Sequence, residues 1–488
     1  MASPIPKSPE QSEKNRKYDR QLRLWNDHGQ ALLEGAHICL INANALGTEI
    51  LKSLVLPGIG AFTIIDGNKV TEEDIGSNFF LDADSVGKSR AHVSTQFLLE
   101  LNPDVRGDYI DEGPEQILNN SPDFFNNFNV VIACAILEKS LIILAKKLWE
   151  LDIPLIVCKT IGFVGYIRVQ VKEHTIIEMH PDNEIPDLRL NKPFELLKTY
   201  FDSIDLNNFD IRDHSHTPYV IILYKYLQQW LINYQDIPRT KIEKEQFKQM
   251  IIDGSSSFWI IAKAIKDFME NEGDGLLPLK GALPDMIADT EKFISLQQVY
   301  HKQANTDIEA VWKRTLQLLR QLGKPSDSIS EKDVKLFCRH ASELCIQRGS
   351  SLANEYDAKL INTNEIAQSL ENPESLMVYY VVLRGVEKFQ AEYNAYPGEF
   401  DDHVEPDIVK LKACISKLLG EWGCAPLAKD DYVHEFCRFG GAELHSVSAM
   451  IGGLVAQETV KFITHQYKPI NNTFIYDAVT CSGSTFIF

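Results

Sequence analysis

The chain has 488 residues, which corresponds to about three domain-sized units and excludes a single small module. It carries 49 Lys and Arg residues against 68 Asp and Glu residues, and the resulting net charge of −19 repels phosphate backbones and anionic lipids. This charge argues against a general nucleic-acid-binding protein and a membrane-surface protein, and the content of 44 % hydrophobic residues argues against a disordered chain.

The ends of the chain and its cysteines indicate the compartment. Residues 1–16 lack the apolar segment of a signal peptide, and no apolar run approaches the length of a membrane span. We therefore expect a flexible polar tail over 1–16 and a cytoplasmic or nuclear protein. The nine cysteines show no metal-finger spacing, so they are expected to be reduced thiols, and no bound metal is expected.

The first third of the chain alternates apolar strands with helices. This alternation is typical of a mostly parallel sheet covered by helices, so the predicted fold class is α/β and doubly wound. The expected strands are 36–42, 61–66, 129–135 and 154–159, with a further ribbon over 165–178, and the expected helices are 46–56, 86–103 and 137–150.

After this region the strand signal largely disappears until the end of the chain. Apolar residues at helical spacing predict helices at 219–234, 258–271 and 308–322. A helix at 445–464 and strands at 471–477 and 484–488 are expected to return to the first domain and complete its sheet. The predicted domains are an α/β part over 17–170, a helical insertion over 171–439 and a closing part over 440–488.

The first strand-to-helix turn, INANALG (41–47), lies where a dinucleotide or ATP fold carries Gly-x-Gly-x-x-Gly. Asn42 and Asn44 occupy two of the glycine positions, and only Gly47 remains. Asn tolerates the left-handed conformation, so the bend can form, whereas the Asn44 side chain would occupy the approach of a phosphate. The sequence therefore predicts a preserved bend without a phosphate site.

Asp66 ends the second predicted strand, where such folds keep an acidic residue for ribose hydroxyls. The alternative is a strand-end turn with Gly67 and Asn68, which the turn preference of Asp-Gly favours. Asp66 alone does not decide between the two.

Four segments now point to a family: KYDRQLRLWNDHGQ (17–30), INANALG, SLVLPGIGAFTIIDGNKVTEEDIGSNFFL (53–81) and SVGKSRA (85–91). Together they resemble the adenylation domain of the enzymes that activate ubiquitin-like modifiers, which has a Rossmann-like fold of the ThiF/MoeB type. Later segments resemble the regulatory, non-catalytic subunits of the neddylation branch of this family: 180–197, 213–230, 283–289, 429–464 and 471–477.

The resemblance implies a division of labour between two chains. This chain would form an obligate heterodimer with a catalytic subunit, which would bind ATP and Mg and carry the reactive cysteine. The pair would adenylate the C-terminus of a ubiquitin-like modifier, form a thioester with it and pass it to a conjugating enzyme. This chain itself would bind no cofactor, nucleic acid or membrane and would hold no catalytic residue.

The resemblance also implies which site residues are lost. Active members carry an Arg that meets the ATP phosphates and a Lys in the next helix, and these positions are Ser77 and Arg90 here. The metal-binding Asp expected after the 129–135 strand is missing, because no Asp occurs between Val130 and Leu151. Without these groups the charge that develops in phosphoryl chemistry would be uncompensated.

Transfer of the modifier to a cysteine would need an exposed thiolate. Cys338 and Cys345 are the nearest candidates in the insertion, and FCRHASELCIQR (337–348) is predicted to be one helix with both thiols near its apolar positions. Buried structural cysteines are the favoured interpretation. The nucleophile is then expected on the partner chain.

Arg20 is the residue that this chain is expected to give to the active site. The resemblance implies that the Arg of YDRQ crosses the dimer interface and touches ATP bound to the other subunit. The alternative is a surface Arg paired with Asp19. The segment 283–300 has an apolar face after a Pro-containing turn, which fits either ordinary core or a surface for the partner chain. On the second interpretation Asp285, Met286 and Ile287 are candidates for partner contact.

Two other functions remain open at this point. The chain could be a self-sufficient nucleotide-dependent enzyme with a degenerate glycine loop, which predicts ATP or NAD binding by the isolated chain. It could also be a stand-alone scaffold, which predicts a stable monomer without effect on modifier activation. The clusters at 213–216 and 434–445 contain ligand-type side chains, but turn and helix-cap chemistry explains them better than a metal.

Overall fold

The computed structural model describes residues 16–121, 123–181, 186–190, 192–206, 213, 216–234 and 257–488. The chain divides into two compact units. The first combines Met1–His174 with Ile346–Phe488, and the second is Thr175–Cys345. No helix in the described part of the chain is both long and apolar enough to cross a membrane.

The first unit is built on one eight-stranded sheet with the order β10-β9-β6-β5-β4-β1-β2-β3. The five strands β5, β4, β1, β2 and β3 are parallel to one another. β6 is antiparallel to β5, β9 is antiparallel to β6, and β10 is antiparallel to β9. The strands are β1 (His37–Ile41), β2 (Ala61–Ile65), β3 (Arg106–Ile110), β4 (Val130–Cys134), β5 (Leu155–Ile161), β6 (Val164–Gln170), β9 (Thr473–Asp477) and β10 (Ser482–Phe486).

The return of the C-terminal strands to the first sheet is confirmed. β9 pairs with β6, so residues more than 300 positions apart are neighbours in the ladder, with Tyr166 opposite Ile475. The doubly wound α/β fold is confirmed as well, because the parallel strands alternate in sequence with helices that cover both faces of the sheet.

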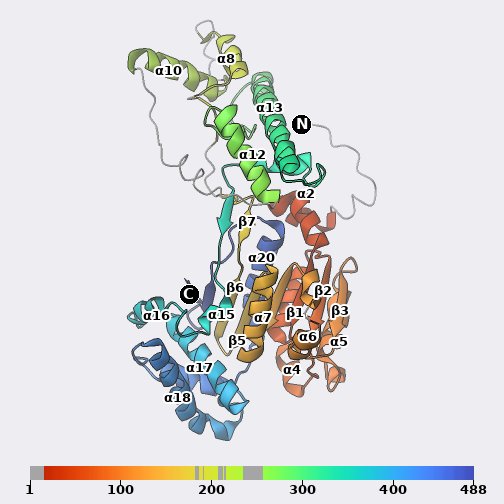
Figure 1. The fold of residues 1–488 in the computed structure, drawn as a ribbon, viewed down its shortest axis with the longest axis vertical. Coiled ribbons are helices and arrows are strands. Elements are labelled where there is room, and N and C mark those ends of the chain that lie inside the picture. The colour runs from red at the N-terminus through yellow and green to blue at the C-terminus, as the bar shows by residue number, and fades with distance from the viewer. Residues whose placement is uncertain are drawn as a thin grey trace. The chain divides into compact units, whose positions relative to one another are not determined.

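Successive residues of the central strands belong to two different cores. Ile38 and Leu40 of β1 pack beneath one group of helices, whereas Cys39 and Ile41 pack beneath the other. The first group is α2 (Asp19–Gly35), α3 (Ala45–Val55), α5 (Arg90–Glu100) and α20 (His445–Thr464); the second includes α7 (Glu138–Leu151), α17 (Met377–Tyr393), α18 (Val404–Trp422) and α19 (Asp431–Phe439). Figure 1 shows α7 lying along the face of the sheet.

Shorter elements complete this unit. They are α4 (Glu72–Ser77), α6 (Pro114–Asn120), α15 (Leu352–Glu355), α16 (Thr363–Leu370) and the 3-10 turns Ala83–Ser85, Phe124–Asn127 and Asp401–His403. The edge strand β3 was not predicted from the sequence. Its residues RGDYI are half-buried or exposed, so it lacks the apolar run that marks a central strand.

The second unit is helical, as the periodicity predicts. It contains α8 (Glu195–Asp202), α10 (Tyr219–Tyr234), α12 (Ser257–Asn271), α13 (Thr290–Gln321) and α14 (Glu331–Arg339). Phe201, Val220, Leu296 and Tyr300 form one of its cores. Burial of these apolar faces stabilises helices whose sequences are otherwise polar.

The prediction of one helix over 337–348 was wrong. α14 ends at Arg339, a turn follows, and Cys345 begins the short strand β8 (Cys345–Gln347). β8 forms a two-stranded sheet with β7 (His174–Ile176), where the chain passes between the units. Two apolar residues seven positions apart fit a helix and a helix-turn-strand equally well, so the spacing alone could not separate these structures.

The helical unit is also shorter than the predicted insertion over 171–439. The chain from Ile346 onward belongs to the first unit, where α17 to α19 bury Val381, Leu411 and Phe436 in the same core as α7. Helical periodicity identifies a buried face, but it does not say which core receives that face.

Buried charges connect the sheet to these covering helices. Arg168 on β6 is fully buried and forms an ion pair with Glu355 of α15, which is 3 % exposed. On α17, Arg384 contacts Glu387 at 2.9 Å, and Lys159 of β5 also pairs with Glu387. Each charge therefore has a partner of opposite sign inside a water-poor layer.

Candidate functional site

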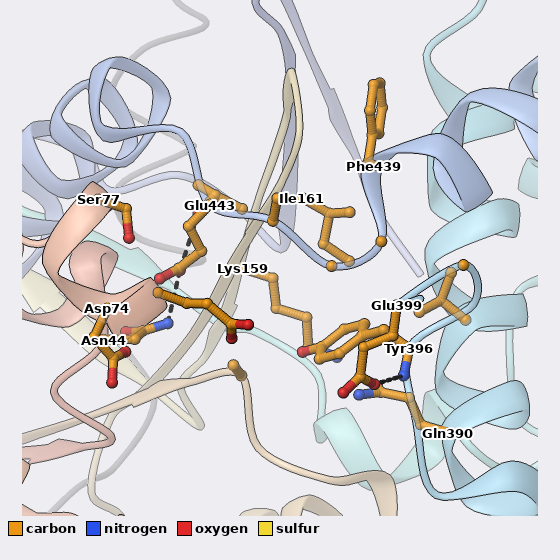
Figure 2. Close-up of a pocket in the computed structure, with 18 of the residues that line it drawn as sticks. Asn44, Asp74, Ser77, Lys159, Ile161, Gln390, Tyr396, Glu399, Phe439 and Glu443 are labelled. Carbon is orange, nitrogen blue, oxygen red and sulfur yellow. Dashed lines mark hydrogen bonds between the residues drawn. The ribbon is translucent and has the colours of Figure 1, made fainter. Parts of the chain in front are cut away.

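The loop that follows β1 lies at the point of the sheet where an α/β fold binds its ligand. β1 pairs with β2 on one side and with β4 on the other, and ligands bind outside the carboxyl ends of strands at such a switch in strand order. A cavity of about 770 Å³ opens there. Its walls come from the loop itself, α4, the end of β5, α17 and the loops 396–400 and 438–443 (Figure 2).

The predicted bend is confirmed. Asn42 adopts a left-handed conformation with φ of 67°, and its side-chain Nδ2 donates to the Cys134 carbonyl at 2.7 Å. The one remaining glycine is required for close packing, because a Cβ at Gly47 would lie 2.4 Å from the Asn42 carbonyl oxygen.

The loop differs from a phosphate cradle in what its N–H groups contact. The Ala43 N–H donates to Asp66 Oδ2 at 2.9 Å, and the Ala45 N–H donates to Glu443 Oε2 at 3.0 Å. The Gly47 N–H donates to Oδ1 of Asn44, the N-cap of α3, at 3.0 Å. In a nucleotide site such groups point at phosphate oxygens, whereas here protein oxygens already accept these three donors.

Glu443 contacts the loop 42–47 but was not predicted from the sequence as part of the site. Its Oε1 accepts from Asn44 Nδ2 at 2.7 Å and from the Thr160 hydroxyl at 3.2 Å. Figure 2 shows its side chain reaching Asn44 from the segment before α20. Burial raises the pKa of Glu443 to about 7, against the opposing effect of hydrogen bonds from Thr160 and Ala45.

Asp66 is held within the protein. It is fully buried, and its Oδ1 accepts from the backbone N–H and the side chain of Asn68, both at 2.9 Å. Its Oδ2 accepts from Arg90 Nε at 2.7 Å in addition to Ala43. The turn interpretation is therefore confirmed, and these four hydrogen bonds occupy the carboxylate that a ribose would need.

Arg90 and Ser77 lie at the same cavity. The Arg90 guanidinium bridges Asp66 and Asp74, with 3.0 Å between its Nη1 and Asp74 Oδ1. Ser77 is the last residue of α4 and presents a short neutral side chain to the cavity. The two positions at which active relatives are expected to carry phosphate-binding cations thus provide one arginine tied to two carboxylates and one serine.

The cavity is acidic as a whole. Its three cationic side chains all have carboxylate partners: Arg90 contacts Asp66 and Asp74, Lys159 contacts Glu387, and Arg438 contacts Glu435. Five carboxylates line the same space: Glu73, Asp74, Glu387, Glu399 and Glu443. An excess of negative charge around a cavity opposes the binding of a triphosphate.

Arg20 lies in the first turn of α2 and is exposed. Asp19 forms an ion pair with Arg23 at 2.8 Å. The alternative prediction, in which Arg20 pairs with Asp19, is therefore wrong. α2 is kinked at Trp25 and Asn26, where Asn26 has φ of 57°, and the Trp25 indole donates to Gln30 within the core. The kink separates the turn that bears Arg20 from the half of the helix that packs on the sheet.

The candidate nucleophiles are poorly suited to thiolate chemistry. Cys338 is 1 % exposed, and burial raises the pKa of its thiol to about 12. Cys345 is half-buried on β8. Of the nine cysteines only Cys481 is exposed, in the turn between β9 and β10.

The metal-type clusters have other structural roles where they are described. The Thr217 hydroxyl donates to the Asp213 carbonyl at 2.8 Å, and His214 and Ser215 lie outside the described residues. His445 contacts Glu49 at 3.2 Å. Within the described ranges, no group of three or more His, Cys, Asp or Glu residues could hold a metal ion.

The candidate contact residues lie in the second unit. Met286 packs against the core that contains Leu296 and Tyr300, whereas Ile287 is 83 % exposed. Asp285 is exposed beside them. Of the three, Ile287 is the apolar side chain that is exposed and so available to another protein.

Comparison with known proteins identifies the family. The ThiF family model matches residues 18–486. The NEDD8-activating enzyme E1 regulatory subunit of Danio rerio is 46 % identical, covering 97 % of this chain and 98 % of that protein. The subunits of the same name from Gallus gallus and Drosophila melanogaster are 45 % and 44 % identical, over 97 % and 99 % of this chain and 98 % and 99 % of their own lengths. The chain therefore belongs to the ThiF family and, within it, to the NEDD8-activating enzyme E1 regulatory subunits.

Proposed function

We propose that this chain is the non-catalytic half of a heterodimeric activating enzyme and that a catalytic partner subunit binds ATP and Mg. The assembled pair adenylates the C-terminus of the ubiquitin-like modifier NEDD8, forms a thioester on a cysteine of the partner and passes the modifier to a conjugating enzyme. This chain supplies architecture, a docking surface and one arginine, Arg20.

The contacts of the loop 42–47 carry this proposal. A triphosphate needs free N–H groups and cations at the strand ends. Here Asp66, Asn44 and Glu443 accept the Ala43, Gly47 and Ala45 N–H groups, and carboxylates outnumber cations around the cavity. The same contacts argue against a self-sufficient nucleotide enzyme, which requires an open loop.

Exposure of Arg20 supports a role at the site of the other chain. A guanidinium reaching phosphates bound by another subunit must be free of the core, and Arg20 is exposed on a turn that a kink separates from the packed half of α2. Contact with ATP phosphates would then stabilise the negative charge of the adenylation transition state.

A reconstituted thioester assay tests the function. The chain is purified together with the catalytic subunit, and modifier thioester is measured with and without it. We expect a stable complex and thioester formation only when both chains are present. A stable monomer without effect on the thioester would support the scaffold alternative. ATP binding by the isolated chain at micromolar concentration in calorimetry would support the self-sufficient enzyme.

Ile287 is expected to contribute to the docking surface. Replacing Ile287 by Asp places a charge where an apolar side chain would be buried, so we expect affinity for the catalytic subunit to fall about 10-fold, as measured by biolayer interferometry. Leu322→Asp is the matched control, since Leu322 is 49 % exposed in the same unit. If the two variants bind the partner equally well, Ile287 has no role in docking.

A further inference from the structure

Helix α3 begins in an unusual way for a buried helix. Its first turn contains no acidic residue, although the N-terminus of a helix favours negative charge. The charge comes instead from Glu443, 399 positions after Asn44. Three donors surround this carboxylate: the Ala45 N–H, the Asn44 Nδ2 and the Thr160 hydroxyl.

We propose that these donors form an oxyanion seat, which the chain fills with its own Glu443 carboxylate in place of an external anion. The seat accepts the chemical class of small oxyanions, and a free carboxylate such as acetate can enter it once the Glu443 side chain is removed. In the intact protein the filled seat fastens the segment 438–443 to the sheet.

The backbone of residues 438–443 positions the Glu443 carboxylate at the seat. Gly440 and Gly441 both adopt left-handed conformations, with φ of 58° and 79°, and a Cβ at Gly441 would lie 2.5 Å from the Tyr396 ring. The Gly162 N–H then donates to the Ala442 carbonyl at 2.8 Å, which fixes the backbone beside Glu443. The chain therefore turns sharply and is held by the end of β5 where the carboxylate enters.

The charge of Glu443 is met by hydrogen-bond donors and the helix N-terminus. Within the described part of the chain, no Lys or Arg forms an ion pair with it. This is the arrangement of an anion site, in which oriented N–H and O–H groups replace a counter-ion. When the Glu443 side chain is removed, these donors are left without an acceptor, which acetate can supply.

Chemical rescue tests the seat. The melting temperature of Glu443→Ala is measured at about pH 8.5 in sodium acetate and in sodium chloride of equal ionic strength. We expect Glu443→Ala to melt below the wild type, and about 100 mM acetate to raise its melting temperature by about 1–3 °C more than chloride does. The wild type and Glu399→Ala, whose side chain lines the same cavity, should respond equally to the two salts.

Hydrogen exchange gives a second measurement. Amides at the start of α3, over residues 45–48, should exchange faster in Glu443→Ala and slow again in acetate. Should Glu443→Ala fail to fold, Glu443→Gln keeps the shape but loses the charge, and it should also show faster exchange at 45–48 than the wild type. The proposal would be overturned if acetate and chloride changed the melting temperature of Glu443→Ala equally, or if Glu443→Gln exchanged at 45–48 as slowly as the wild type. Because the isolated chain is used, this outcome is independent of heterodimer formation.

Discussion

Replacing Arg20 by Ala is expected to slow adenylation of the modifier by the assembled heterodimer by about 10³-fold, the lower end of the effect of an arginine supplied to a phosphoryl group. The loss of one exposed side chain should leave the fold and the assembly intact, because Arg20 is exposed in the first turn of α2. Modifier-dependent pyrophosphate exchange measures the rate, and size-exclusion chromatography checks the assembly.

Arg23 provides the control for this experiment. It lies one turn further along the same helix and pairs with Asp19 at 2.8 Å, so Arg23→Ala removes an equal charge with little effect on adenylation. Arg20→Lys should recover only part of the rate, since a lysine provides a point charge without the planar fork of a guanidinium. An adenylation rate of Arg20→Ala equal to that of the wild type would refute the role in trans.

Replacing Glu355 by Ala is expected to cause the largest loss of stability. The change leaves Arg168 fully buried without its carboxylate and also removes the contact of the Tyr380 hydroxyl at 3.4 Å. Breaking a buried ion pair from one side costs about 3–5 kcal/mol, because the remaining charge is no longer compensated. Urea unfolding followed by circular dichroism measures the change.

Two further variants serve as controls for the loss of stability in Glu355→Ala. Glu374→Ala removes an exposed carboxylate just before α17 and should alter stability by less than about 0.5 kcal/mol. The double variant Arg168→Met with Glu355→Leu removes both charges, and we expect it to recover most of the stability lost in Glu355→Ala. If Glu355→Ala unfolds at the urea concentration of the wild type, the buried pair does not hold the covering helices on the sheet.

The strands of the central sheet could be predicted because burial on both faces requires continuous apolar runs. β1, β2, β4 and β5 are almost entirely buried, and each appears as such a run in the sequence. β3 was missed because an edge strand needs no apolar run. β8 was missed because three residues hold too little periodicity to separate a strand from the end of a helix.

The site could be predicted only where its signal is local. The Asn residues at positions 42 and 44 indicated both a bend and a blocked phosphate approach, and the left-handed Asn42 and the Asn44 cap agree with this. Glu443 could not be found in this way, since its contacts join residues 399 positions apart. A Gly-Gly pair followed by an acidic residue before a helix is the one local sign of the loop that delivers it.

The long span between α3 and Glu443 affects the order in which the protein forms during synthesis. Glu443 follows Asn44 by 399 positions, and at about 5–20 residues per second this length of chain takes about 20–80 s to synthesise. For that time the Ala45 N–H lacks its Glu443 acceptor, and β6 lacks β9 beside it. The early half of the sheet is therefore made with an open strand edge and with one unpaired N–H at the start of α3, and such an edge can pair with other chains until β9 is added.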